Sequence, residues 1–153
     1  MRYWLMKSEP SVFTIEDLEN TPTQTVDWIP TKGIRNYQAR NFMRDDMSLG
    51  DLAFFYQSNC ESPGIVGIMK ITKLAYPDPL QFLEDNKYYD PKSTTENPRW
   101  LNVDVTLVKK LPLIELKSLR SNTKLKDMMI LRKGNRLSIT PVTQDEWSLI
   151  NTI

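Results

Sequence analysis

The segment 100–111 alternates apolar and polar residues: Leu101 and Val103 are separated by Asn102, and the alternation continues to Leu107. A half-buried β-strand requires this period of two, because successive side chains point to opposite faces of a sheet. Further strands are expected at 3–7, 52–57, 65–74 and 136–139. Strands therefore follow one another in runs, which favours an α+β domain on a small curved or barrel-like sheet over a doubly wound parallel one.

Short helices are expected between these strands. Two of them have the spacing of a capping box, which satisfies N–H groups of a first helical turn: Thr14 with Asp17, and Thr143 with Glu146. Asn36 is a candidate cap for a third helix over 37–46. Short helices are also expected near 115–119 and 123–131. Loops are expected over 21–30 and in a long proline-rich connection over 75–99, with one helical turn near 80–84.

The 153 residues are expected to form a single domain, 1–153. No apolar run approaches the roughly 20 residues of a membrane span, and Lys7 interrupts the N-terminal apolar stretch too early for a secretory signal. Cys60 is the single cysteine, so no internal disulfide is expected and a reducing compartment is indicated. We expect a cytoplasmic protein in a bacterium or a nuclear one in a eukaryote, without secretion or membrane association.

Positive charge gathers in one part of the sequence. Residues 99–136 contain ten Lys and Arg against three Asp and Glu, although the whole chain has a net charge of only +1. Such a segment is typical of a surface that meets phosphate groups. A solvated strand and helix with exposed lysines is the alternative interpretation.

The chain lacks the residues that most catalytic sites need. It contains no histidine, so a serine or Cys60 has no imidazole to activate it. Lys7 and Ser8 are neighbours on an expected strand, where their side chains point to opposite faces. Without histidine, and with one cysteine, a zinc site is not expected either. We therefore expect no catalytic residues, no metal and no cofactor, and a protein that recognises a ligand rather than transforming it.

The stretch from Gly33 to Phe42 has the composition of a recognition site. It contains two arginines, three side-chain amides and two aromatic rings within ten residues, and it follows Trp28. Aromatic rings stack on a nucleobase, and polar groups read its hydrogen-bonding edge. Helical spacing makes Tyr37 and Phe42 core-facing by default, which leaves Arg35 and Asn36 as the contribution of this stretch to a pocket. Trp28 has a simpler interpretation too, as a core residue.

Motifs along nearly the whole chain resemble the EVE domain of the PUA-like superfamily, of the thymocyte nuclear protein type and its bacterial relatives, which is related to YTH domains. The motifs that carry the resemblance are Tyr3 to Pro10, Trp28 with Gly33 to Phe42, Gly50-Asp51, Phe55 to Asn59, Pro63 to Gly67, Tyr76 to Asp78, Asp90 to Ser93, Pro98 to Trp100 and Arg136 to Ser138. The resemblance implies a curved, barrel-like mixed β-sheet flanked by short helices. It also implies a non-enzymatic reader of a modified base, chiefly modified cytosine such as 5-methylcytosine in DNA, flipped into an aromatic and polar pocket.

The resemblance and the residue chemistry together give a set of candidate site residues. The base-binding pocket is expected to contain Lys7, Ser8, Trp28, Arg35, Asn36, Tyr56, Ser58 and Asn59. Phosphate groups are expected to meet Arg40, Arg99 and Arg136. Gln57 stands where the family usually has histidine, and strand alternation points it away from the face of Tyr56 and Ser58.

The expected partner is nucleic acid that carries a modified base, with DNA favoured over RNA, and the sequence does not identify a protein partner. A reader of modified RNA bases, as in YTH domains, is the first alternative. An enzyme that acts on a modified nucleotide or on RNA is the second.

Overall fold

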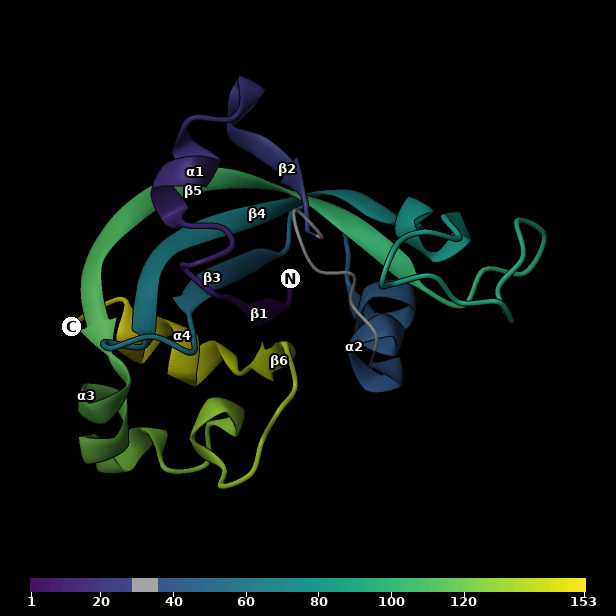
Figure 1. Ribbon diagram of the computed structural model, residues 1–153. Helices are drawn as coiled ribbons and strands as arrows, with labels where there is room; N and C mark the ends of the chain where they lie inside the picture. The colour runs from purple at the N-terminus through teal and green to yellow at the C-terminus, as the bar shows by residue number, and fades with distance from the viewer. Residues whose placement is uncertain (29–35) are drawn as a thin grey trace.

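The computed structural model describes residues 1–28 and 36–153. Its centre is a six-stranded mixed sheet with the strand order β2-β5-β4-β3-β1-β6. The strands are β1 (Tyr3–Ser8), β2 (Thr25–Asp27), β3 (Leu52–Gln57), β4 (Gly64–Pro77), β5 (Leu101–Glu115) and β6 (Ile139–Val142). β1 and β3 run parallel, and the other neighbouring strands are antiparallel. Figure 1 shows β4 and β5 curling together as one long arc.

Helices and short helical turns occupy the connections. The helices are α1 (Ile15–Glu19), α2 (Tyr37–Asn41), α3 (Leu116–Ser121) and α4 (Gln144–Ile150), and a π-helical turn at Phe42–Asp46 continues α2. Four 3-10 turns lie at Pro22–Gln24, Pro79–Phe82, Thr123–Leu125 and Met129–Leu131. The expected α+β class with a curved mixed sheet is confirmed. In the part of the chain that the structure describes, the sheet stays open, with β2 and β6 as its edges.

Both predicted capping boxes form. The Thr14 hydroxyl accepts the Asp17 N–H at 3.0 Å, and the Asp17 carboxylate accepts the Thr14 N–H at 2.8 Å. Thr143 and Glu146 exchange the corresponding bonds at 3.1 and 2.9 Å at the start of α4. Each pair satisfies two N–H groups that a helix of only a few residues would otherwise leave to water.

The sheet buries apolar side chains on both faces, and neighbouring residues of β1 belong to different cores. Trp4 and Met6 lie in one hydrophobic cluster with α1, Trp28 and Met43, which we call the Trp4 cluster. Leu5 lies in the second, the Leu5 cluster, with residues of α3 and α4. This alternation follows from strand geometry, since successive side chains leave a strand on opposite sides. The face that a residue of β1 or β3 points to is therefore fixed by its position in the sequence.

Three local expectations were wrong. The stretch expected to be a loop over 21–30 contains β2, whose Thr25 hydroxyl lies 2.7 Å from that of Thr106 on β5. The last strand begins at Ile139, three residues later than predicted, and its register with β1 starts at the pair of Met6 and Ile139. The expected helix over 123–131 is two separate 3-10 turns. For β2, pairing with β5 outweighs the local sequence preference.

Candidate nucleic-acid-binding site

Several predicted site residues meet at one end of the sheet because β1 and β3 are parallel. Lys7 is the register partner of Tyr56, and Ser8 is that of Gln57, so the two strands end side by side. The Ser58 N–H donates to the Ser8 carbonyl at 3.0 Å, which continues the pairing just past the end of β3. Lys7, Ser8, Tyr56, Ser58 and Asn59 are thereby gathered within a few residues of a common edge.

Strand alternation divides this group between the two faces of the sheet. Tyr56 belongs to the Leu5 cluster, so Lys7 opposite it lies on the same face. Ser8 points to the other face, where its hydroxyl donates to the Phe13 carbonyl at 2.7 Å. Gln57 shares the face of Ser8, and its amide donates to the Ser62 carbonyl at 2.7 Å. Gln57 thus holds the loop that follows β3.

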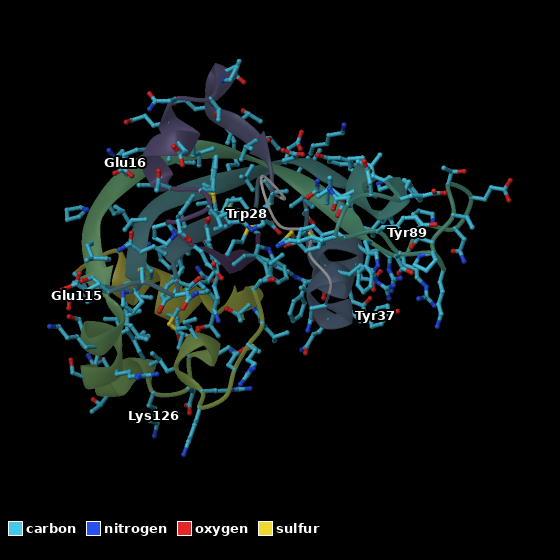
Figure 2. All side chains as sticks on the ribbon, viewed as in Figure 1. Glu16, Trp28, Tyr37, Tyr89, Glu115 and Lys126 are labelled. Atoms are coloured by element: carbon cyan, nitrogen blue, oxygen red, sulfur yellow. The ribbon has the colours of Figure 1, made fainter. Side chains whose placement is uncertain are left out.

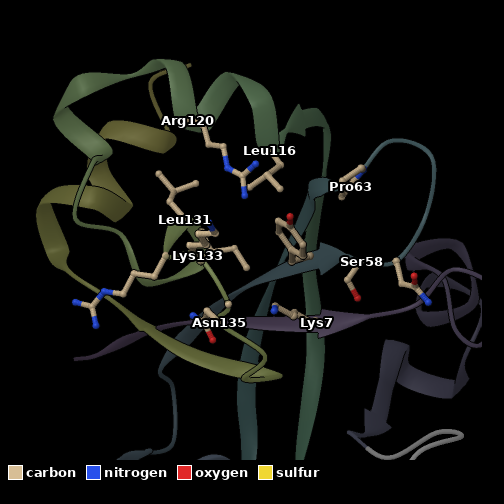
Figure 3. A pocket seen from close by; sticks show the side chains of 13 residues that line it. Lys7, Ser58, Pro63, Leu116, Arg120, Leu131, Lys133 and Asn135 are labelled. Atoms are coloured by element: carbon tan, nitrogen blue, oxygen red, sulfur yellow. The ribbon is translucent and has the colours of Figure 1, made fainter.

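On the Leu5 side, four predicted residues line a cavity of about 580 Å³, which we call the Lys7 pocket. They are Lys7, Tyr56, Ser58 and Asn59. Its other walls are Pro63, Leu116, Arg120, Ile130, Leu131, Arg132, Lys133, Gly134 and Asn135. Figure 3 shows Arg120 reaching toward the cavity from α3, with Lys7 on β1 at the opposite side and Leu131 and Lys133 beside them. A cavity of this volume accommodates a nucleotide-sized ligand.

The Lys7 pocket is strongly positive. Lys7, Arg120, Arg132 and Lys133 line it, and none of its lining residues carries a carboxylate. Burial lowers the pKa of the Lys7 ammonium, because a half-buried group loses part of its hydration. Burial also raises the pKa of Tyr56 to about 12, although the positive charge of Arg120 acts in the opposite direction. The Tyr56 phenol is therefore neutral at physiological pH and is able to donate a hydrogen bond.

Trp28 lies on the other side of the sheet. Its ring meets Phe55 edge-on with the ring centroids 5.4 Å apart, and the backbone N–H of Trp28 donates to the Val103 carbonyl at 2.9 Å. Only 5% of Trp28 is exposed, and it belongs to the Trp4 cluster. The structure therefore does not bring Trp28 and Tyr56 together. Figure 2 shows Trp28 near the middle of the molecule.

Asn36 caps α2, as its position predicted. Its side-chain oxygen accepts the Ala39 N–H at 2.9 Å, and Ala39 and Met43 anchor this helical segment in the Trp4 cluster. Asn36 is exposed on the Trp28 side of the sheet. Arg35 lies outside the described residues, so its predicted place in the pocket stays a prediction.

Two of the three predicted phosphate-binding arginines have partners within the protein. The Arg40 guanidinium donates to the Arg99 carbonyl at 3.2 Å and to the Asn41 side chain, and it lies 4.6 Å from the Tyr37 ring centroid. Arg99 pairs with Asp90 at 3.6 Å. Tyr37 stacks on Trp100 and is 49% exposed, so the expectation that it faces the core is wrong, whereas Phe42 does pack against the Trp4 cluster.

Arg136 is exposed at the end of a positively charged turn over 132–136, which we call the basic turn. Asn135 holds this turn, since its amide donates to the Met129 carbonyl at 2.6 Å and its oxygen accepts the Leu137 N–H at 2.9 Å. Gly134 has a φ of +77°, a conformation that glycine adopts without strain. The sequence identified the basic segment 99–136 but not Arg120, Arg132 or Lys133, because nothing local indicates which cations α3 and the turn direct into one cavity.

No helix among the described residues is long and apolar enough to cross a membrane. The described residues also contain no cluster of His, Cys, Asp and Glu that could hold a metal ion.

Comparison with known proteins gives one consistent result. The family model of the EVE domain matches residues 2–153. Thymocyte nuclear protein 1 of Homo sapiens is 48% identical over 166 aligned positions, which cover 97% of this chain and 72% of that protein. A crystal structure of the human THYN1 protein in complex with DNA containing 5-methylcytosine aligns with a TM-score of 0.91 at 45% identity, over 99% of this chain and 96% of that one. A Pseudomonas putida protein aligns with a TM-score of 0.90 at 45% identity, over 98% and 97% of the two chains.

Proposed function

Because the chain belongs to the EVE domain family, we propose that it is a DNA-binding module that recognises a modified base, with 5-methylcytosine as its preferred mark. The observation that carries the proposal is the likeness to the human THYN1 protein in complex with DNA containing 5-methylcytosine, at a TM-score of 0.91 and 45% identity over 99% of the chain. At this TM-score the two chains follow nearly the same backbone path. The basic cavity at the end of β1 and β3 supports binding to a polyanion.

The Trp28 side of the sheet is the better place for the base itself. A methylated cytosine has two flat ring faces and an apolar methyl group beside its polar edge, and an indole offers the faces and the methyl group stacking and dispersion contacts. The Lys7 pocket offers four cations instead, which suit an anion rather than a neutral base. We therefore place the base beside Trp28, with Ser8 and Asn36 as polar groups on the same side of the sheet. A contribution of Arg35, which lies outside the described residues, stays a prediction.

Stacking on Trp28 requires a rearrangement. With 5% of the residue exposed, the side chains that now cover the indole must move aside before a base can contact its face. The energy of that movement is recovered from the new stack, worth about 1–3 kcal/mol for each base. A change in tryptophan fluorescence on binding, absent in Trp28→Phe, would accompany this step.

The direct test of function is a binding screen. Duplex and single-stranded DNA oligonucleotides, identical except for cytosine, 5-methylcytosine, 5-hydroxymethylcytosine or N6-methyladenine at one position, would be titrated by fluorescence anisotropy. We expect the 5-methylcytosine DNA to bind several-fold more tightly than the unmodified DNA, by roughly the value of one buried methyl group, about 0.8 kcal/mol. Equal affinity for all oligonucleotides would refute base recognition.

Two alternatives have definite signatures in the same screen. If matched RNA binds more tightly than DNA, the 2′-hydroxyl is being recognised and the chain is an RNA reader. If mass spectrometry detects an altered base or a cleaved strand after prolonged incubation, the chain is an enzyme. The absence of histidine throughout the sequence favours recognition without chemistry.

A further inference from the structure

The cations of the Lys7 pocket have no counter-ions among the residues that the structure describes. Within residues 1–28 and 36–153, none of Lys7, Arg120 and Lys133 makes an ion pair, and neither does Arg132. Elsewhere in the described chain such pairs are common: Arg44 meets Asp45 at 2.8 Å, and Lys117 meets Glu115 at 3.0 Å. Four unpaired cations around one cavity repel each other, and that repulsion is relieved only when an anion enters.

The three segments that bear these cations are each anchored by hydrogen bonds of their own. Lys7 is on β1, and its backbone N–H donates to the Ser138 carbonyl at 2.9 Å. Arg120 lies in the last turn of α3, whose first N–H, that of Leu116, donates to the Pro63 carbonyl at 2.9 Å. Asn135 fixes the basic turn through the two hydrogen bonds described above. The backbone positions from which these side chains reach the pocket are thus set before an anion enters.

Neutral donors complete the set. The Tyr56 phenol lies at the wall of the pocket and keeps its proton, and the Ser58 hydroxyl lies two residues further along the same chain. Asn59 next to them has a φ of 51°, which turns the chain around the rim of the pocket. Several N–H and O–H donors around one volume, with no carboxylate among them, match a tetrahedral oxyanion such as phosphate.

We propose that the Lys7 pocket binds a phosphodiester group of the DNA strand, with Lys7, Arg120 and Lys133 as its charged donors. The inference rests on the proposed function, because the phosphate belongs to the strand whose modified base lies on the Trp28 side. Lys7 and Ser8 are adjacent residues with side chains on opposite faces. A strand that passes the common end of β1 and β3 is therefore able to place a base on one face and a phosphate on the other.

The variants that test the inference differ only in which cation is lost. Arg120→Gln removes an exposed side chain at the pocket, and Lys126→Gln removes an equally exposed cation of the same segment that lines none of the described cavities. Both variants lower the net charge by one. Binding of 5-methylcytosine DNA and of unmodified DNA would be measured between 50 and 200 mM salt. A second arm would replace single phosphodiesters of the methylated strand by neutral methylphosphonates, and a third would use inorganic phosphate as competitor.

We expect Arg120→Gln to weaken both DNAs by the same factor, roughly three- to tenfold, and to reduce the slope of log Kd against log salt by about 0.9. Lys126→Gln should leave that slope nearly unchanged. One methylphosphonate position should weaken the unchanged protein but not Arg120→Gln, which identifies the phosphate that the pocket holds. Competition by inorganic phosphate with the unchanged protein, lost in Arg120→Gln, should accompany these results.

The outcomes separate this inference from the proposed function. If Arg120→Gln matches the unchanged protein in affinity and salt slope while 5-methylcytosine DNA is still preferred, the phosphate site is wrong and the proposed function stands. If the Arg120-dependent slope is found without any preference for the methylated base, the phosphate site stands and base recognition is wrong. If inorganic phosphate competes but no methylphosphonate position matters, the pocket binds free phosphate and the inference of a DNA phosphate is overturned. Absence of DNA binding by the unchanged protein overturns both.

Discussion

At the end of β1 and β3 the two faces of the sheet differ in chemistry, although neighbouring residues of the same strand point to them. On the Leu5 side, Lys7 opens into a cavity with three other cations and no acid among its lining residues. On the Trp4 side, Trp28 is 5% exposed and packs edge-on against Phe55. The first face offers charge to solvent, and the second offers an aromatic ring that is already part of the core.

This difference assigns different parts of recognition to the two faces. Contacts between cations and phosphates give affinity that depends on salt and carries no sequence information. Contacts with a ring depend on the shape and apolar area of the base, and therefore on its methyl group. The comparison predicts that changes on the Trp28 face alter selectivity and stability, whereas changes in the Lys7 pocket alter affinity for every DNA alike.

The largest effect is expected from Trp28→Ala. Removing a buried indole from the Trp4 cluster leaves a cavity, so the free energy of unfolding should fall by about 3–5 kcal/mol. Urea unfolding followed by circular dichroism measures this change. Trp28→Phe, which keeps an aromatic ring, is the matched control and should lose less than half as much. If Trp28→Ala unfolds at the same urea concentration as the unchanged protein, the indole does not support the core.

Lys7→Met should raise the free energy of unfolding, whereas Trp28→Ala lowers it. Burial lowers the pKa of Lys7, which means that folding disfavours its charged form. At pH values between that lowered pKa and the ordinary one, the unfolded chain binds more protons than the folded chain. The free energy of unfolding therefore rises as the pH rises through this window. At pH 7 the ammonium is therefore a cost, and Lys7→Met should stabilise the fold by up to about 1 kcal/mol, a small value because solvent screens a half-exposed group.

The advantage of Lys7→Met should shrink when the unfolding measurements are repeated at pH 10. The same variant should bind all DNAs more weakly, because the Lys7 pocket loses a cation. A variant that is both more stable and weaker in binding is the signature of a residue kept for function. Lys7→Met that is less stable than the unchanged protein at pH 7 would contradict this explanation.

A small effect, similar in size to that of Lys7→Met, is expected from Ser8→Ala. It removes the hydrogen bond from the Ser8 hydroxyl to the Phe13 carbonyl, at a cost of about 1 kcal/mol. If Ser8 also contacts the base, the variant should lower the preference for 5-methylcytosine DNA without changing the salt slope. An unchanged preference, measured by anisotropy at two salt concentrations, would limit Ser8 to its structural bond.

The sequence predicted the elements that depend on local pattern. The alternation over 100–111 became β5, and the capping residues Thr14 and Thr143 begin α1 and α4. It did not predict β2, whose three residues become a strand only through pairing with β5. Short polar segments of this kind have no strong preference of their own, and tertiary contacts decide their structure.

The candidate site shows the same division. The resemblance and the residue chemistry predict that Lys7, Tyr56, Ser58 and Asn59 share a pocket, and in the structure these four residues line one cavity. Arg120 and Lys133 were not singled out, because their side chains reach the pocket only after α3 and the basic turn fold over the Leu5 face. Sequence patterns locate residues along an element, but they do not show which elements meet.

The central claim is that the two faces act separately in recognition, and one paired measurement tests it most directly. The ratio of Kd values for unmodified and 5-methylcytosine DNA, and the salt slope of Kd, would be determined together for the unchanged protein, Trp28→Phe and Arg120→Gln. We predict that Trp28→Phe lowers the ratio and keeps the slope, whereas Arg120→Gln keeps the ratio and lowers the slope by about 0.9. If either variant changed ratio and slope together, the two faces would form one site and the claim would be wrong.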